Sequence, residues 1–460
     1  MSFFARLIDP RTSLDRERQP FDNLALKAMI VPLLIEQLLQ MVVGIADTMM
    51  VSYAGEATVS GVSLDTMIYT IFIYLFTAVA TGGAVVVAQY IGHGDKKQAD
   101  LAASQVFHIA GLLSLVCTAL TLVFGNGVLR LLYADVAPEV MSACKTYLWI
   151  VALSFPANAF YNAGAALYRS MGKTRVTMYV SVAMNLLNVI GNAIGVFVLR
   201  AGAAGVAWPT TISWYFAAVV MTALCFRDSI EVRVRLQEML RLKRDMAKRV
   251  LRIAVPNATE QVLFQLAKVV LGSLIATFGT SQIAANGIGQ TLWSLAACMS
   301  VSMGPVFITV VGQCMGAGDA EAAEWYMRKM MRLSLALAIG WNILVTALVP
   351  LILPLYSITA ETRYFIWMTV LIHNFFAAVA QPFASPLSSG MRAAGDVNFT
   401  LWSSVLCTVV FRTALSFVLG LWLHMGIIGI AWAMVLDWTL KAVLDIIRFK
   451  GGKWKTKKVI

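Results

Sequence analysis

Apolar residues run along this chain in long blocks that short polar stretches separate. A run of about 20 apolar residues can cross the hydrocarbon core of a bilayer, and backbone groups in lipid must be satisfied within their own segment, which favours helices. Prolines at Pro156 and Pro382, inside two of the longest blocks, predict kinks. The pattern predicts twelve membrane-spanning helices, at residues 25–52, 58–90, 98–125, 139–170, 175–199, 204–226, 248–275, 281–314, 321–349, 362–391, 397–420 and 428–449.

Composition supports an integral membrane protein. The 460 residues are 59% hydrophobic and only 13% charged, whereas about a quarter of the residues of a soluble domain are charged. The six cysteines are scattered without a C-x-x-C pair, so no zinc site or disulfide framework is expected. We expect no cofactor beyond a coupling ion. The N-terminus is too charged for a secretory signal and is typical of a cytoplasmic tail, amphipathic at residues 3–8.

The net charge of +12 is explained by where the basic residues lie. They concentrate in the N-terminal tail, in every second loop, in the linker 227–247 and in the C-terminal tail 450–460. Because basic loops stay on the cytoplasmic side, we expect both termini inside the cell, in a plasma membrane of the bacterial inner-membrane kind. Basic residues on that side can contact anionic lipid head groups, which accounts for the positive net charge. The sequence therefore gives no support for nucleic-acid binding.

One short string occurs twice, as "AQYIGHGD" at 88–95 and "GQCMGAGD" at 312–319. Its glycines permit the left-handed backbone that ends a helix, so we expect each copy to close one helix and its aspartate to open the next. Glu36 and Glu260 are separated by the same 224 residues, and Arg169 and Arg392 by 223. The repeated positions of the string are Gln89, Gly92, Gly94, Asp95, Gln313, Gly316, Gly318 and Asp319.

The repeat predicts two lobes with the same orientation. Six helices is an even number, so both halves enter the membrane from the same side, as in transporters built from parallel repeats. The expected fold is all-α, with an N-lobe at 25–226, a C-lobe at 248–449 and a substrate path between them. Residues 1–24 form a tail, and we expect a monomer.

The segments "VPLLIEQLLQMVVGIADTMMVSYAG", "LYRSMGKT" and "AGVAW", together with the repeated string, resemble the multidrug and toxic compound extrusion (MATE) transporters of the MOP flippase superfamily. The resemblance covers nearly the whole chain. It implies an antiporter that exports small amphiphilic compounds by alternating access, driven by an inward H+ or Na+ gradient. It implies no enzymatic activity.

Asp47 in "GIADTMM" is the first candidate for ion coupling. Ionisable residues inside a membrane are costly and are functional candidates by default, and a carboxylate can bind a proton or a cation. The resemblance places the coupling carboxylate of the N-lobe at this aspartate. The alternative is a structural carboxylate that hydrogen-bonds to a neighbouring helix.

Asn188 and Asn192 share one helix face because they are four residues apart. In the MATE lineages that the chain resembles most, the second position carries an aspartate. Asn192 departs from that pattern, which favours H+ over Na+ at the Asp47 cluster. Either Asn158 or Asn162, with Thr210, would complete the cluster; the alternative is that these polar side chains hold helices together.

Four further charged residues are substrate or cavity candidates. Glu36 and Glu260 are repeat partners that either face a cavity or form matching structural hydrogen bonds. Lys268 and Arg412 stand where the N-lobe has Gly44 and an asparagine. They would contact an anionic part of the substrate or neutralise Glu260; snorkelling or pairing with a carbonyl is the alternative.

Three polar residues near the end of the C-lobe complete the candidates. His373 is a lone intramembrane histidine that could relay protons, although a packing role is more common. Asp437 and Lys441 are four residues apart, and we expect them to form a salt bridge.

Two rival functions remain open from the sequence. A lipid-linked saccharide flippase of the same superfamily would also have many helices and a cationic cavity. An intramembrane aspartyl protease would carry G-x-G-D, but the Asp95 and Asp319 strings continue into polar residues that belong at the water interface. The chain has no P-loop, so ATP drive is not supported.

Overall fold

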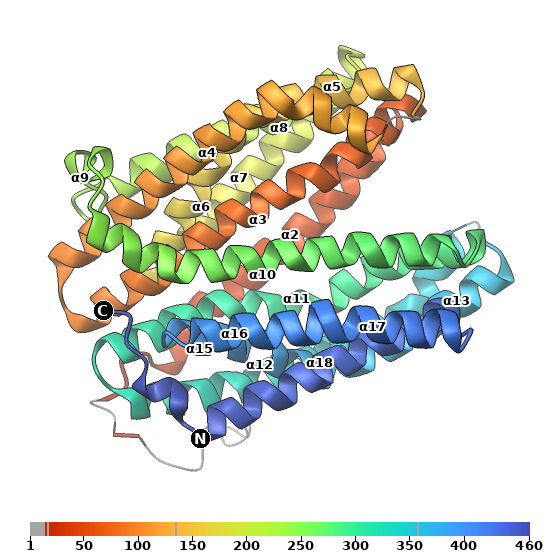
Figure 1. Ribbon diagram of the computed structural model, residues 1–460. Helices are drawn as coiled ribbons and strands as arrows, with labels where there is room; N and C mark the ends of the chain where they lie inside the picture. Colours follow the sequence, from red (N-terminus) through yellow and green to blue (C-terminus); the bar gives the residue numbers. More distant parts are fainter. Residues whose placement is uncertain (1–13, 16–17, 134–135, 357) are drawn as a thin grey trace. The chain divides into compact units, whose positions relative to one another are not determined.

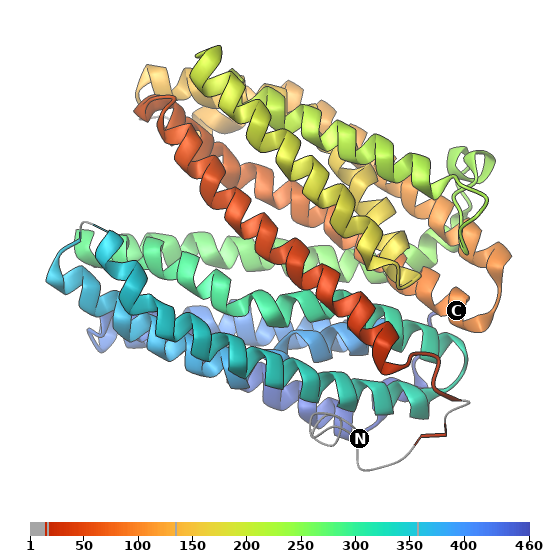
Figure 2. The same cartoon turned by 180° about the vertical axis from the view of Figure 1, so that it is seen from behind.

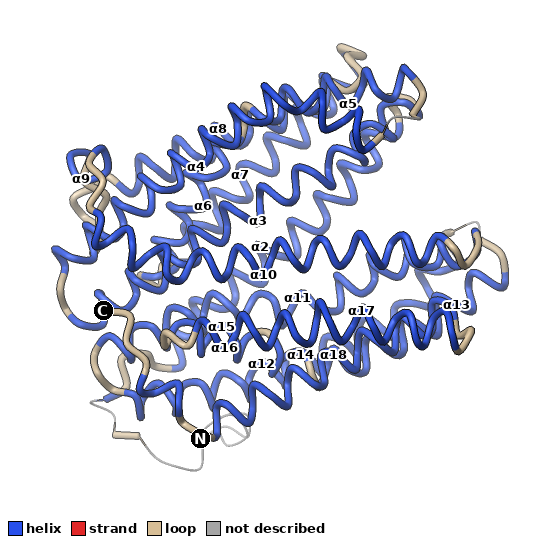
Figure 3. The backbone as a smooth tube through the Cα atoms, in the orientation of Figure 1, coloured by secondary structure: helices blue, strands red, loops and turns tan. Residues whose placement is uncertain are grey.

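A computed structural model describes residues 14–15, 18–133, 136–356 and 358–460. All regular structure in these ranges is helical, with no strand (Figure 3). The amphipathic stretch predicted at residues 3–8 lies outside the described residues. The all-helical prediction is therefore confirmed for the described chain.

The chain divides into two compact units, here the N-terminal unit, Lys27–Ala258, and the C-terminal unit, Thr259–Ile460 with the residues before Lys27. In the N-terminal unit α3 packs on α4, α5 and α6, and α7 packs on α8 (Figure 1). Its elements are α2 Asn23–Ser52, α3 Glu56–His93, α4 Lys96–Leu132, α5 Pro138–Ala152, α6 Phe155–Ser170, α7 Thr174–Ala193, the π-helix η2 Ile194–Val198, α8 Ala204–Cys225, α9 Leu236–Leu240 and the start of α10 Arg244–Ala276.

The C-terminal unit contains the rest of α10 and the later helices. In it α11 packs on α12, α13 and α15. Its further elements are α11 Thr280–Gly316, α12 Ala320–Ile352, η3 Leu353–Leu355, α13 Ala360–Val379, α14 Gln381–Ala384, α15 Pro386–Ala393, α16 Val397–Ser404, the π-helix η4 Val405–Phe411, α17 Arg412–Ser416, the π-helix η5 Phe417–Trp422, α18 Gly426–Lys450 and η6 Lys453–Thr456.

Ten of the described helices are long and apolar enough to cross a membrane, and two bent pairs raise the number to twelve. The pairs are α5 with α6, bent by 47°, and α13 with α14 and α15, bent by 59°. Each break lies just before Pro156 or Pro382, so both predicted kinks are confirmed. A proline lacks the amide that would continue the helix and its ring crowds the preceding turn.

The two copies of the repeated string end helices as predicted. Gly94 has φ of 78° and Gly318 has φ of 77°, the left-handed conformation that costs glycine little. The Asp95 carboxylate then accepts from the amide of Gln98 at 3.1 Å, and Asp319 accepts from Ala322 at 2.9 Å. Both aspartates are therefore N-caps, not catalytic groups.

The repeat extends to the unusual backbone positions of both units. Arg200 and His424 are the non-glycine residues with positive φ in the described chain, at 51° and 53°. They are 224 residues apart (424 − 200). Four glycine pairs share this pattern at spacings of 224 or 223: Gly55 and Gly279, Gly94 and Gly318, Gly172 and Gly395, and Gly202 and Gly426. The two halves therefore share one backbone plan.

A close helix crossing holds the polar face of α7 in place. A Cβ on Gly195 would lie 1.9 Å from the carbonyl oxygen of Gly205, so η2, which continues α7, and the start of α8 meet backbone to backbone. Gly429, the repeat partner of Gly205, makes the same kind of approach to the backbone of Leu419. The crossing brings the asparagines of α7 level with Thr210 of α8.

The segment before α2 belongs to the C-terminal unit. Arg18 donates to Asp319 at 2.6 Å and to Glu321 at 3.0 Å. The hydrogen bond from Arg18 holds the pKa of the Asp319 carboxyl below its usual value. Tyr326 donates its hydroxyl to the carbonyl of Phe21 at 2.6 Å.

Candidate functional site

Asp47 lies in the second half of α2, half-buried, where α2 runs beside α7 (Figure 2). Asn192 of α7 donates to its Oδ1 at 3.0 Å. No cation lies within ion-pair distance of this carboxylate among the residues that the structure describes. A half-buried carboxylate held by a neutral amide keeps its capacity to bind a positive charge.

Asn188, one turn earlier on α7, extends the cluster. It lies 3.2 Å from the hydroxyl of Thr210 and accepts from Asn192 at 3.2 Å. With its amide nitrogen turned toward α2, Asn188 would donate to both oxygens of Asp47, at 3.0 and 3.1 Å. Asp47, Asn188, Asn192 and Thr210 therefore form one polar site, as the sequence predicted.

Asn158 and Asn162 on α6 do not complete this site through hydrogen bonds to Asp47. Asn162 donates instead to the carbonyl and to the side-chain oxygen of Asn158, both at 2.9 Å. Asn158 is fully buried. The two residues form a local pair within α6, four residues apart.

Glu36 and Glu260 form matching ion pairs in the two units. Arg169 donates to Glu36 Oε1 at 2.7 Å, and Arg392 donates to Glu260 Oε2 at 2.6 Å. Thr177 adds a longer hydrogen bond to Glu36 at 3.3 Å. The arginines belong to the "LYRSMGKT" motif and its repeat, so the motif supplies the cation for the acid of each pair.

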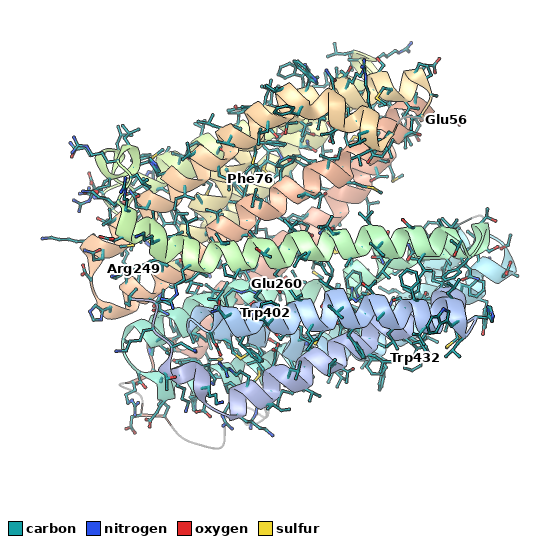
Figure 4. All side chains as sticks on the ribbon, in the orientation of Figure 1. Glu56, Phe76, Arg249, Glu260, Trp402 and Trp432 are labelled. Carbon is teal, nitrogen blue, oxygen red and sulfur yellow. The ribbon has the colours of Figure 1, made fainter. Side chains whose placement is uncertain are left out.

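Glu260 has more partners than Glu36 has (Figure 4 labels Glu260 on α10). Ser404 donates to its Oε1 at 2.7 Å, and Lys441 lies 3.7 Å from the same oxygen. The expectation that Lys268 or Arg412 neutralises Glu260 is therefore wrong. Arg392 and Lys441 do so, because their side chains reach the two oxygens of Glu260.

The predicted salt bridge between Asp437 and Lys441 is also wrong. Asp437 is fully buried and pairs with Arg412, whose Nε donates to its Oδ2 at 2.8 Å. Thr408 donates to the other oxygen at 3.1 Å. Residues four apart on a helix can pair, but here Asp437 pairs with Arg412 from the neighbouring helix α17.

Lys268 has a different environment from Arg412. It is exposed on α10, and its Nζ lies 5.6 Å from the ring centroid of Phe264. The guanidinium of Arg412 lies 5.6 Å from the same ring. Within the described chain no carboxylate lies in ion-pair distance of Lys268. The surface around Lys268 and Phe264 therefore keeps a net positive charge.

His373 packs among aromatic rings. Its ring lies 6.3 Å from that of Trp293 and 6.0 Å from that of Trp438. Neither ring nitrogen has a hydrogen-bond partner among the described residues. This environment fits the packing role better than a proton relay, which needs hydrogen-bonded neighbours.

Four further buried acids of the described chain were not singled out from the sequence; two of them, Asp65 and Asp445, lie inside apolar blocks, and the others are Asp100 and Asp396. Asp445 of α18 accepts from Ser388 at 2.5 Å, and Asp65 of α3 is fully buried. The available signal was an acidic residue inside an apolar block, the same signal that pointed to Asp47.

A cavity of about 550 Å³ lies away from these acids, within the N-terminal unit. Side chains of α3, α4 and the start of α10, such as Leu75, Leu112 and Val255, form its apolar wall. It holds no part of the Asp47 site.

Comparison with known proteins gives a consistent result. The family model MatE matches residues 32–194 and 256–418, two segments whose starts are 224 residues apart. The uncharacterized transporter YisQ of Bacillus subtilis is 26% identical over 452 residues, covering 96% of this chain and 97% of YisQ. The probable multidrug resistance protein NorM of Thermotoga maritima is 24% identical, covering 97% of this chain and 96% of NorM.

Solved structures show the same fold. An outward-facing structure of a multidrug resistance MATE family transporter of the MOP superfamily superposes with a TM-score of 0.88 at 19% identity. The superposition covers 96% of this chain and 99% of the other. At this identity the likeness concerns the fold alone.

The two matching ion pairs differ in what remains when the arginine is removed. Arg169→Met leaves Glu36, of which 3% is exposed, with Thr177 alone among its described side-chain partners. We expect the free energy of unfolding to fall by about 3–5 kcal/mol, the usual effect of leaving a buried charge without its partner. Arg392→Met leaves Glu260 with Lys441 and Ser404, so about 1.5–3 kcal/mol, one charged hydrogen bond, is expected. Thermal unfolding of both variants in detergent measures the order.

The double variant Glu36→Gln/Arg169→Met is the control, since it removes the stranded charge and should unfold at a higher temperature than Arg169→Met alone. An Arg392→Met variant that is at least as unstable as Arg169→Met would contradict this account of the two pairs.

Proposed function

This chain belongs to the MatE family, and from that premise we propose that it exports small amphiphilic organic compounds in exchange for cations that enter the cell. Members of the family are transporters, not enzymes, so the aspartyl protease alternative is excluded. The saccharide flippase alternative has no observation in its favour. In this proposal the two lobes alternate access in a plasma membrane, with both termini in the cytoplasm.

The observation that carries the proposal is the contrast between Asp47 and three other acids of the spans. Glu36, Glu260 and Asp437 each have an arginine within ion-pair distance. Asp47 has amides. A permanently paired acid cannot exchange its charge cheaply, whereas an acid held by neutral groups can bind and release a cation at each cycle.

The amides also favour a proton as the coupling ion. An asparagine side chain carries both a donor and an acceptor, so by turning it can bond either the ionised or the protonated acid. The Oδ1 of Asn192 is buried without a partner in the described chain and could accept the proton of a neutral Asp47. A Na+ site would instead need several oxygens around the ion, and here a second acid is replaced by Asn192.

The positive surface around Lys268 and Phe264 extends the proposal to the substrate. By the repeat, Arg412 stands where the N-terminal unit has Asn188, and Lys268 where it has Gly44. The repeat partner of Asp47 is Leu271, so the C-terminal unit has no acid at that position and carries Lys268 one turn earlier instead. An ammonium beside an aromatic ring suits an amphiphile that carries an anionic group.

Asp47→Asn tests the coupling role. The amide has the shape of the acid but cannot take up a proton or a cation, so gradient-driven export of a fluorescent dye by proteoliposomes should fall to the level of empty liposomes. The protein should remain folded, as thermal unfolding in detergent would show. Glu361→Gln, at an exposed acid of α13, is the matched control and should export normally. Export by Asp47→Asn at the wild-type rate would end this mechanism.

Lys268→Gln tests the substrate contact. Export of an anionic dye should fall about tenfold, the effect of losing roughly 1.4 kcal/mol of attraction, while export of a cationic dye of similar size is unchanged or faster. Lys268→Arg keeps the charge and should restore anionic export. Equal loss for both dyes, or no loss for either, would remove Lys268 from the substrate site and leave the role of Asp47 untouched.

A further inference from the structure

Asp65 of α3 is a buried acid that the proposed mechanism does not use. Its side chain is fully buried, and neither carboxylate oxygen has a hydrogen-bond partner among the described residues. The backbone of Leu148 on α5 lies close to Asp65 without meeting hydrogen-bond geometry. A charged residue inside a membrane span is costly and seldom without function.

The packing of α3 against α5 seals Asp65 from solvent. One turn earlier, a Cβ on Gly61 would lie 2.8 Å from the Cβ of Ala143, so the two helices touch at their backbones. Leu129, Cys144 and Leu148 form an apolar cluster on the same side, against Leu64 and Ile68 of α3. The acid is therefore buried beside closely packed apolar side chains of α3, α4 and α5.

The titratable groups near Asp65 are all of kinds that are neutral at physiological pH. They are Tyr69 on α3 itself, Tyr133 at the end of α4, and Cys144 and Tyr147 on α5.

The charged residues of the outer ends of the same helices do not pair with Asp65. Glu56, Arg130 and Glu139 are exposed, and Lys145 is half-buried; none lies in ion-pair distance of Asp65. An ionised carboxylate in such a place would cost several kcal/mol. The geometry therefore requires Asp65 to hold a proton as a neutral acid.

Tyr69 lies on α3, four residues after Asp65, and it is also buried. The Tyr69 hydroxyl, one turn along α3, is directed toward Ser154, Asn158 and Trp214. The Tyr69 hydroxyl and Asn158 Nδ2 are both buried without hydrogen-bond partners in the described chain. Small rotations would let these groups bond to one another, as a route for protons requires.

Asp65 and Asp47 belong to the same end of the N-terminal unit. Asp47 precedes the turn between α2 and α3 and Asp65 follows it, so both lie within about 15 Å of that turn along their helices, at 1.5 Å per residue. Tyr147 of α5 lies near both acids.

We propose that Asp65 is a second proton-binding group of the N-terminal unit, which holds a proton in this conformation and exchanges it through Tyr69 during transport. The inference rests on the proposed function, since it adds a second carrier to a proton-driven exporter. The O–H bond of Asp65 breaks and leaves an ionised carboxylate. Its proton passes to a neighbouring hydroxyl, which passes on its own proton, or to an ionised carboxylate, which becomes neutral.

Infrared spectroscopy of the purified protein tests this directly. At neutral pH the wild type should show the C=O stretch of a protonated carboxylic acid, and Asp65→Asn should lack it while unfolding within a few degrees of the wild type. Asp65→Leu, apolar and of similar size, should also lack the band. A band of unchanged strength in Asp65→Asn would overturn the proposal, whatever that variant does in transport.

Counting the protons transported tests the role of Asp65 in transport. Proteoliposomes with an internal pH dye report protons entering per dye molecule exported, and this ratio should fall to about half in Asp65→Asn, because one of two proton sites is gone. An unchanged ratio would overturn the role of Asp65 in coupling. Loss of coupling in Asp47→Asn together with a normal Asp65→Asn would reject this inference and keep the proposed function, whereas a normal Asp47→Asn would reject the proposed function.

Discussion

An acid inside a membrane protein must be neutralised, because a bare carboxylate in an apolar surrounding costs far more free energy than a fold can spare. This constraint organises the described chain. Glu36 is neutralised by Arg169, Glu260 by Arg392 and Lys441, and Asp437 by Arg412. Such fixed pairs tie helices together and leave little freedom for charge exchange.

Asp47 satisfies the same constraint in another way. Its neighbours are the amide side chains of Asn192 and Asn188, which stabilise a charge without cancelling it. The acid can therefore alternate between a charged and a neutral state, and a site that alternates can couple an ion gradient to a change of conformation. Structural acids and the proposed coupling acid thus differ in the kind of neighbour they have, not in depth alone.

Much of the fold was predictable from the sequence because it follows from local rules. Apolar blocks gave the helices, Pro156 and Pro382 gave the bends, and the repeated strings gave the left-handed glycines and the aspartate caps. The π-helical segments around α17 were not predictable, since they depend on packing and not on composition.

The candidate site was predictable only where the repeat or a helix face fixed neighbours. The pair of Asn188 and Asn192 followed from their spacing, but the choice of Arg412 as the partner of Asp437 required knowing which helices touch. The arginine partners of Glu36 and Glu260 could have been found, since both members of each pair recur at nearly the same spacing. Asp65 has no acidic repeat partner, because Gly289 stands at that position, and only its burial marks it.

The central claim is that ion exchange occurs at the amide-held carboxylate of Asp47. The most direct test is the release of protons when a transported compound is added to purified protein in a weakly buffered detergent solution, followed with a pH electrode. The account predicts proton release from the wild type and none from Asp47→Asn, with compound binding retained in both. Equal release from the two proteins would contradict it.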